Sequence, residues 1–347
     1  MGQLKRINGI GIKKGSTWGT WVKPGTGNGM HIVTHNAPKG GRAIQDNSNE
    51  YGQKMASATF ALNYEAQNGP FTAPLYTGGL ETMFASVFGI YTSSTAETTV
   101  ITHKFALDDG EIDEIFHTIA WDDYGTQITT VPSAKIKSFE LASDSNGEMT
   151  CTIEYMGNTV SIAQSTGPLA LTYADDGTKV HKLLASTVYI NAQAGADFSA
   201  GDAISVNALK AKIERGYKAM PPESGSSSVQ APVDADAPKG SLELNLTKST
   251  ATSSGWLTAF YGETQYKAKI VCDAGAIAGK TAHYLATLYL PCLQIETAPD
   301  VSEDTPRPVK CSFKVLKKTA APTGMSSGLP YLEVVNEVAA LTGYPAT

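Results

Sequence analysis

The sequence lacks the features that mark membrane-spanning and secreted proteins. No apolar run in its 347 residues approaches the ~20 residues that cross a bilayer. The opening stretch MGQLKRINGIGIKKG contains no apolar segment of the kind found in secretory signal peptides. The myristoylation pattern fails as well, because Arg6 stands where that pattern requires Ser or Thr. We therefore expect a protein that is made and folded in a cytoplasm.

Charge is scarce, and positive charge is scarcer than negative. Charged residues form 17% of the chain, and the formal net charge is −6. A protein that grips nucleic-acid phosphates is normally basic, with its lysines and arginines clustered. If DNA is a partner of this chain, we expect it to be tolerated rather than tightly held.

Cysteine is rare and carries no metal-binding pattern. The four cysteines are Cys151, Cys272, Cys292 and Cys311, and no two of them form a C-x-x-C pair. Most lie in strand-like runs, so we expect buried, reduced thiols; a disulfide or a bound metal is the alternative.

Recognisable catalytic and ligand-binding motifs are also missing. The stretch GAIAGKT at 275–281 has three residues between its glycines, where a phosphate-binding loop has four, and strand-like sequence follows it. His31 and His35 lie in a strand-like run, where this spacing is too wide for one metal ion. No Ser/His/Asp set stands out. We therefore predict that the protein is not an enzyme and has no cofactor and no metal site.

The chain does contain repeated alternation of apolar and polar residues, which is typical of half-buried strands. Strands are predicted at 58–64, 100–105, 115–121, 134–141, 148–155, 169–173, 186–191, 203–213, 242–247, 266–272, 283–295, 309–317 and 331–335. Two short amphipathic helices are predicted at 80–88 and 256–261, each followed by a glycine. The predicted fold class is mainly β, with short flanking α-helices.

Composition divides the chain into four segments. Residues 1–50 are predicted to form an N-terminal arm with a first strand, and 51–219 a β-domain. Residues 220–240 are rich in proline and serine and are predicted to be a linker or a mobile loop. Residues 241–347 form a second β-half. Both halves contain an alternating strand, a short helix that ends at glycine and further strands, so this half is either a duplicated domain or a coincidental match.

The opening stretch GIGIKKGSTWGT resembles a signature of the major tail tube proteins of long-tailed, siphovirus-like bacteriophages. The matching residues are Gly9, Ile10, Gly11, Lys14, Thr17, Trp18, Gly19 and Thr20. Ile12 is extra, and a Lys-Gly pair replaces the usual acidic stretch. The segment VPSAKIKSFELASDSNGEMTCTIEYMGN is similar to a hairpin of that family, and Leu290 with Pro291 matches a C-terminal segment. The stretch 221–239 has no counterpart in the pattern.

The resemblance implies a tail-tube β-sandwich whose copies join as rings with an inner β-barrel, and rings that stack into a conduit for double-stranded DNA. Its expected partners are further copies of itself, the tape-measure protein, the tail terminator and tip proteins, and passing DNA that is not tightly bound. We expect three chains with two tube domains each to complete a ring if the two halves are a true repeat, and six chains if they are not. In either case about 24 strands at ~4.8 Å spacing and ~40° tilt give a wall ~48 Å across. The expected location is the virion tail, after assembly in the host cytoplasm.

The same resemblance suggests two sets of site residues. Trp18, Trp21 and Ile12 are expected to contact the next ring or a neighbouring subunit, although the tryptophans could instead cover the chain's own core. Glu140, Glu154 and Glu243 are expected to face the lumen of the tube.

Two other functions fit a β-rich chain. One is a phage receptor- or carbohydrate-binding or decoration protein with a β-sandwich fold, for which WDDYG at 121–125 is the candidate aromatic cluster. The other is a hydrolase on a β-scaffold, for which the sequence offers no site.

Overall fold

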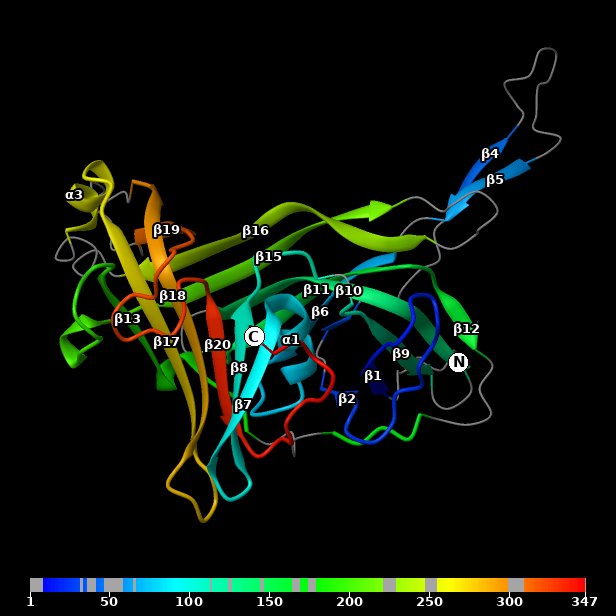
Figure 1. The fold of residues 1–347 in the computed structure, drawn as a ribbon, viewed down its shortest axis with the longest axis horizontal. Helices are drawn as coiled ribbons and strands as arrows, with labels where there is room; N and C mark the ends of the chain where they lie inside the picture. Colours follow the sequence, from blue (N-terminus) through cyan, green and yellow to red (C-terminus); the bar gives the residue numbers. More distant parts are fainter. Residues whose placement is uncertain are drawn as a thin grey trace, which may run out of the picture.

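In the computed structural model of the chain, two short α-helices lie among many antiparallel strands within the described residues (Figure 1). The structure describes residues 9–31, 34–35, 42–46, 59–64, 67–112, 114–123, 127–143, 147–163, 169–173, 179–220, 229–246, 255–298 and 309–346. The helices are α1 (Glu81–Phe88) and α3 (Trp256–Tyr261), and the single 3₁₀ turns are η1 (Leu183–Ala185) and η2 (Ala200–Asp202).

The strands are β1 (Gly9–Lys14), β2 (Gly29–Met30), β3 (Thr34–His35), β4 (Arg42–Asp46), β5 (Thr59–Tyr64), β6 (Gln67–Pro74), β7 (Gly89–Glu97), β8 (Val100–Leu107), β9 (His117–Asp123), β10 (Gln127–Ser143), β11 (Thr150–Gly157), β12 (Ser161–Ala163), β13 (Ser186–Ala192), β14 (Ala203–Ile204), β15 (Ala208–Met220), β16 (Gln230–Leu246), β17 (Gln265–Ala276), β18 (His283–Thr297), β19 (Val309–Val315) and β20 (Tyr331–Asn336).

Seven strands pair side by side in the order β6-β11-β10-β15-β16-β19-β18, which we call the long sheet. Each neighbouring pair is antiparallel. Successive side chains of a strand point to opposite faces, so every strand contributes to both faces of this sheet. One face carries the apolar residues that the sequence alternation predicts, among them Phe139, Ile153, Ile213, Leu242 and Phe313, all at most 1% exposed. This face forms one wall of the core.

Helix α1 covers the apolar face of the long sheet (Figure 1). The rings of Phe84 and Phe88 lie 5.4 Å and 6.0 Å from the ring of Phe139 on β10. The helix ends at Gly89, whose φ of 94° favours glycine, and a Cβ there would lie 2.3 Å from Ile112 Cδ1. Helix α3 covers the same face further along the chain, where Trp256 packs edge-on against Phe313 at 5.4 Å.

Two long strands, β10 and β18, each pair with strands of more than one layer of the fold. The first part of β10 pairs with β9 and β12, and its last part pairs with β11 and β15 in the long sheet. A register shift at Pro132, between Val131 and Ala134, marks the bend between the two parts. In β18 the first part pairs with β17 and β20, and the last part pairs with β19. The other layers extend from these strands, through β9 to β1 and β2, through β20 to β8 and β7, and through β17 to β13 and β14.

The structure confirms most predicted elements and corrects three. Residues 169–173 were expected to form a strand, but Leu169 packs in a small cluster with Ala120 and Ile128 and the segment joins no sheet beyond one isolated bridge. The strand expected at 203–213 is interrupted, because β14 ends at Ile204 and β15 begins at Ala208.

The third correction concerns the predicted linker at 220–240. Met220 ends β15, and residues 230–240 are the first part of β16, so these two strands form one long hairpin. Residues 221–228 lie outside the described part of the chain. The prolines at positions 232 and 238 hide the strand from sequence patterns, yet the hairpin accommodates them through several register shifts.

Strands of the second half pair with strands of the first half in three places. The pairs are β16 with β15, β17 with β13, and β20 with β8. Both halves also contribute to the same buried cluster. The division of the chain into domains stays a prediction.

Candidate functional site

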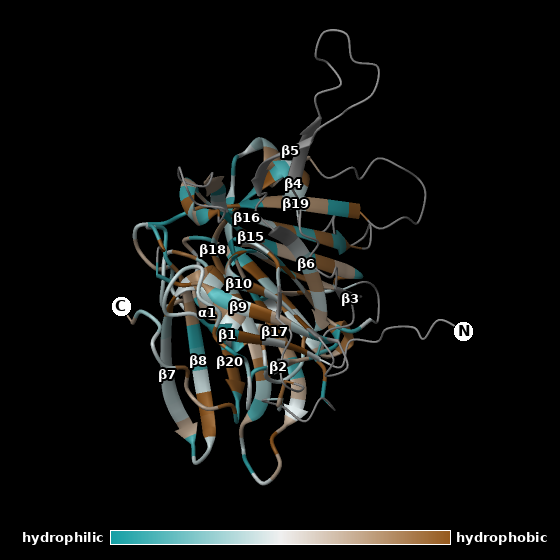
Figure 2. Cartoon of the chain, turned by 90° about the vertical axis from the view of Figure 1, so that its right-hand side faces the viewer, coloured by the Kyte–Doolittle hydropathy of each residue, from teal (hydrophilic) through white to brown (hydrophobic). Residues whose placement is uncertain are grey.

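The polar face of the long sheet is the candidate functional surface. It lies opposite the apolar face, and its members alternate with the core residues along each strand; Figure 2 shows hydrophilic and hydrophobic residues alternating in these strands. By register it comprises Thr72, Thr152, Glu154, Ser138, Glu140, Lys210, Lys212, Glu214, Ser241, Glu243, Lys310, Ser312 and Lys314. Lys137, at a register shift in β10, joins this face through its contact with Glu214.

The structure brings the three acidic residues predicted from the sequence onto this one face. Glu140 lies opposite Lys212 on β15 and opposite Thr152 on β11, two positions from Glu154. Glu243 lies opposite Lys210. Sequence alternation places each of them on the side of its strand away from the core, and the pairing register then brings the strands together. Whether this face lines a lumen stays a prediction.

Cross-strand ion pairs connect most of the charged residues of the polar face. Lys210 Nζ lies 2.9 Å from Glu140 Oε2, and Lys310 Nζ lies 2.9 Å from Glu243 Oε2. Glu214 contacts two lysines, Lys212 at 2.9 Å and Lys137 at 3.2 Å. Opposite charges facing each other across a strand pair favour this register over a shifted one.

The electrostatics of the central pair keep both of its members charged. Partial burial alone would lower the pKa of Lys212, but its hydrogen bond to Glu214 and the charges of Glu214, Glu154 and Glu140 raise it above its usual value. Burial alone would raise the pKa of Glu214, yet hydrogen bonds from Lys212 and Lys137 hold it below its usual range. The polar face therefore carries fixed charges of both signs near neutral pH.

The polar face is balanced in charge rather than acidic. Its carboxylates are Glu140, Glu154, Glu214 and Glu243, and its ammonium groups are Lys137, Lys210, Lys212, Lys310 and Lys314. The sequence analysis named only glutamates for a polar face of this kind, whereas the structure adds five lysines. The stretch LKAKIERG held the missing signal, because its charged residues alternate with the apolar Leu209, Ala211 and Ile213.

The N-terminal aromatic residues pack on their own chain. The ring of Trp18 lies edge-on to Phe116 at 5.6 Å, and its indole Nε1 donates a hydrogen bond to the Val229 carbonyl at 3.0 Å. Ile12 lies in β1 between β2 and β9 and is 3% exposed, so little of its side chain is left for a neighbour. Trp21 is partly buried, and its indole N–H has no hydrogen-bond partner among the described residues. A contact of either tryptophan with a neighbouring chain stays a prediction.

The tryptophan of the aromatic cluster considered for carbohydrate binding is buried. Trp121 lies in β9, is 2% exposed and packs against Tyr155 with ring centroids 6.3 Å apart. Asp122 is 1% exposed and accepts a hydrogen bond from the Leu169 backbone N–H at 2.8 Å. Residues 124–126 lie outside the described part of the chain. A buried tryptophan cannot stack on a sugar.

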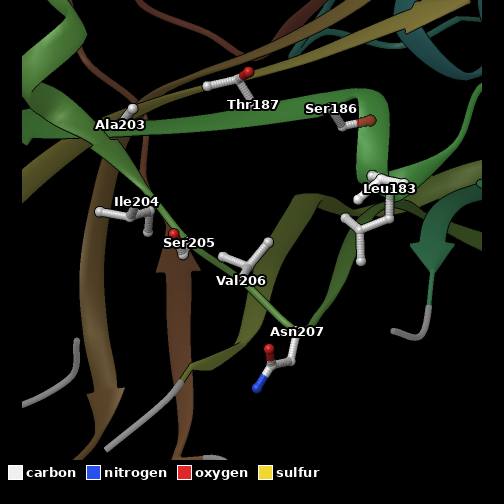
Figure 3. A pocket seen from close by; sticks show the side chains of 9 residues that line it. Leu183, Ser186, Thr187, Ala203, Ile204, Ser205, Val206 and Asn207 are labelled. Atoms are coloured by element: carbon white, nitrogen blue, oxygen red, sulfur yellow. The ribbon is translucent and has the colours of Figure 1, made fainter. Parts of the chain in front are cut away.

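The surface also has hollows away from the long sheet. One, of about 390 Å³, is an open groove between β13 and the segment after η2 (Figure 3). Leu183, Ile204 and Val206 line it together with serine, threonine and asparagine side chains. In the ranges that the structure describes, no three His, Cys, Asp or Glu side chains gather as metal ligands would.

The cysteines agree with the sequence prediction. All four cysteines are buried and unpaired, and burial raises the pKa of the Cys272 thiol to about 11 and that of Cys311 to about 12. Neither helix within the described ranges has the length and apolar character needed to cross a bilayer.

Comparison with known proteins adds one finding. Residues 6–315 match the family model described as "Phage tail tube protein". No protein with curated annotation matches the chain.

Proposed function

Since the chain belongs to the phage tail tube protein family, we propose that its copies close into rings that stack into the tail tube, with the polar face of the long sheet lining a channel for double-stranded DNA. As a tail tube protein it is a structural component of the virion tail. The tape-measure protein and the tail terminator and tip proteins complete the proposed set of partners.

The two faces of the long sheet support this proposal. The apolar face is covered by α1, α3 and the other strand layers, whereas the polar face carries no covering element among the described residues. A sheet of this length with open edges would be prone to uncontrolled pairing as a single molecule. Closure of several copies into a barrel pairs those edges and turns the uncovered face into an inner wall.

The charge balance of the polar face supports a conduit rather than a DNA-binding protein. Tight binding would stop DNA from moving, because each neutralised phosphate adds to affinity through counterion release. Ion pairs such as Lys210 with Glu140 and Lys310 with Glu243 occupy the lysines that would otherwise bind phosphates. The wall is then hydrated and polar without a strong net field.

Reversing charge on the polar face tests this proposal. The double substitution Glu140→Lys and Glu243→Lys breaks both ion pairs and makes the face strongly basic. Tubes of this variant are expected to retain short duplex DNA that is protected from nuclease and is released by salt. The log–log salt dependence of that retention should steepen by about 0.9 for each phosphate that the freed and added lysines neutralise. Unaltered tubes should retain almost none.

The matched control places the same charge change elsewhere on the chain. Glu111 and Glu263 are exposed and lie outside the long sheet, so Glu111→Lys with Glu263→Lys adds the same charge away from the proposed channel. DNA bound to that variant should remain open to nuclease. Equal protection in both variants, or no protection in the polar-face variant although tubes form, would overturn the assignment of this face to the lumen.

A further inference from the structure

The long sheet contains the same three-strand arrangement twice. Its first three strands are β6-β11-β10 and its last three are β16-β19-β18, with β15 between the two sets. Along the chain, the strands of the first set and the elements between them follow the order β6, α1, β9, β10, β11, with the β7–β8 hairpin inserted after α1. The second set follows the same order as β16, α3, β17, β18, β19. We call these two sets unit 1 and unit 2.

Residues correspond between the middle strands of the two units. In β11, Cys151 is followed by Thr152 on the polar face and Ile153 in the core; in β19, Cys311 is followed by Ser312 and Phe313 in the same places. Both cysteines are fully buried and unpaired. Cys151 lies opposite Ala73 on β6, and Cys311 lies opposite Leu244 on β16.

A glycine also recurs at one position. Gly69 on β6 stands four residues before Ala73, the residue opposite Cys151. Gly240 on β16 likewise stands four residues before Leu244, the residue opposite Cys311. A Cβ on Gly69 would lie 2.9 Å from Tyr155 Oη, and a Cβ on Gly240 would lie 2.8 Å from Val315 Cβ. In both units a larger residue on the middle strand fills the space that the glycine leaves. Matching cysteines, matching glycines and matching strand order together indicate an internal duplication.

The junction between the units lies inside the chain. The last part of β10 in unit 1 pairs with β15, where Leu141 lies opposite Ala211. Strand β15 then pairs with β16 in unit 2, where Ala211 lies opposite Leu242. Strand β3 lies beside unit 1 in the same way that β15 lies beside unit 2. His35 on β3 lies opposite Phe71 on β6, and Phe71 corresponds to Leu242 on β16. His35 therefore corresponds to Ala211.

Strand β3 extends the long sheet beyond β6, so the outer strands of the extended sheet are β3 and β18, and each has an open side among the described strands. Strand β3 pairs with β6 alone. Strand β18 pairs with β17 only as far as Gln294, so one side of Ile295–Thr297 is unpaired. In unit 2 Thr297 lies opposite Ser312, and in unit 1 Glu140 lies opposite Thr152. Because Ser312 corresponds to Thr152, Thr297 corresponds to Glu140. The next residue, Ala298, therefore corresponds to Leu141.

We propose that the internal junction is repeated between chains: β18 of one copy pairs with β3 of the next as β10 pairs with β15, and three copies close the ring. This inference rests on the proposed function and specifies its partner and its edge. Each copy supplies the eight strands β3, β6, β11, β10, β15, β16, β19 and β18. Three copies give the roughly 24 strands of a wall ~48 Å across, which is wide enough for a DNA duplex.

An engineered disulfide tests the junction directly. The correspondence places His35 of one copy opposite Ala298 of the next, at the Cα separation of directly opposed residues, which a disulfide can bridge. Tubes of the His35→Cys, Ala298→Cys variant, oxidised with copper phenanthroline, should give covalent dimers and trimers on a denaturing gel and no larger species. Mixing chains that carry one substitution each should give covalent dimers only.

A shifted pair serves as the control. His35→Cys with Thr297→Cys places the two thiols on opposite faces of the sheet, so this variant should not cross-link. Tubes that form without the expected cross-link, or cross-linked species that extend to six chains, would overturn the three-copy junction while leaving the tube itself intact. Failure to form any tube or ring would instead count against the proposed function.

Discussion

At the scale of single residues, Arg215 joins α1 to the long sheet. It is fully buried on β15, and its guanidinium donates to four backbone carbonyls, those of Val87 at 2.7 Å, Phe88 at 3.0 Å, Asp108 at 2.8 Å and Gly110 at 3.3 Å. The first two are carbonyls at the C-terminal end of α1, which have no partner within the helix. Arg215 thereby supplies donors where the helix dipole also favours positive charge.

Replacing Arg215 with methionine is expected to destabilise the chain by about 3–5 kcal/mol, because buried carbonyls lose a charged donor. Urea unfolding of the unassembled chain, followed by circular dichroism, measures the change. Lys218→Met on the exposed part of the same strand is the control and should change stability by no more than about 0.5 kcal/mol. Equal midpoints for the two variants would show that Arg215 does not support α1.

Buried histidines make stability depend on pH. Burial, together with the charge of Lys14, lowers the pKa of His117 to about 3, and burial lowers that of His181 to about 4. An unfolded histidine titrates near pH ~6.5, so the unfolded chain binds more protons than the folded chain between that value and the lowered pKa. Stability is therefore complete above pH ~6.5 and falls as the pH decreases toward about 4.

Thermal unfolding between pH 7.5 and 4.5 measures this dependence. His117 Nε2 and Tyr344 Oη share a hydrogen bond of 2.9 Å. Because protonation of His117 disturbs this contact, the C-terminal segment is expected to loosen first. His117→Gln should flatten the pH profile, because it removes one of these two buried imidazoles, which must charge on unfolding. A melting temperature for the unaltered chain that is constant over this range would contradict the assignment.

At the scale of elements, sequence alternation was enough to find most strands. Strand β8 and helix α1 follow their apolar periodicity, and the glycine after α1 marks its end as expected. Patterns fail where long-range pairing decides the structure. The glycine-rich start was predicted to contain a first strand, and β1 is that strand, but no local signal reveals its partners β2 and β9.

The candidate surface was predictable in part for the same reason. Alternation placed Glu140, Glu154 and Glu243 on the side of their strands away from the core. It could not show that they share one sheet, because that depends on pairings across large sequence separations, such as Lys210 with Glu243. The balancing lysines were visible in the local pattern, but their ion-pair partners become apparent only with the register.

At the scale of the whole molecule, the long sheet relates fold to function. Its apolar face and covering helices build the core, and among the described residues its polar face is uncovered and the outermost strands β3 and β18 each have an open side. In our proposal, duplication of one unit within the chain supplies the template for joining one chain to the next. The proposed tube then repeats a contact that the single chain already makes.

Cryo-electron microscopy of tubes assembled from the purified chain tests this account most directly. The account predicts a hollow tube with three chains in each ring and with Glu140, Glu243 and their lysine partners on the channel wall. Single copies with both outer strands already covered, or a tube whose polar face points outward, would contradict it.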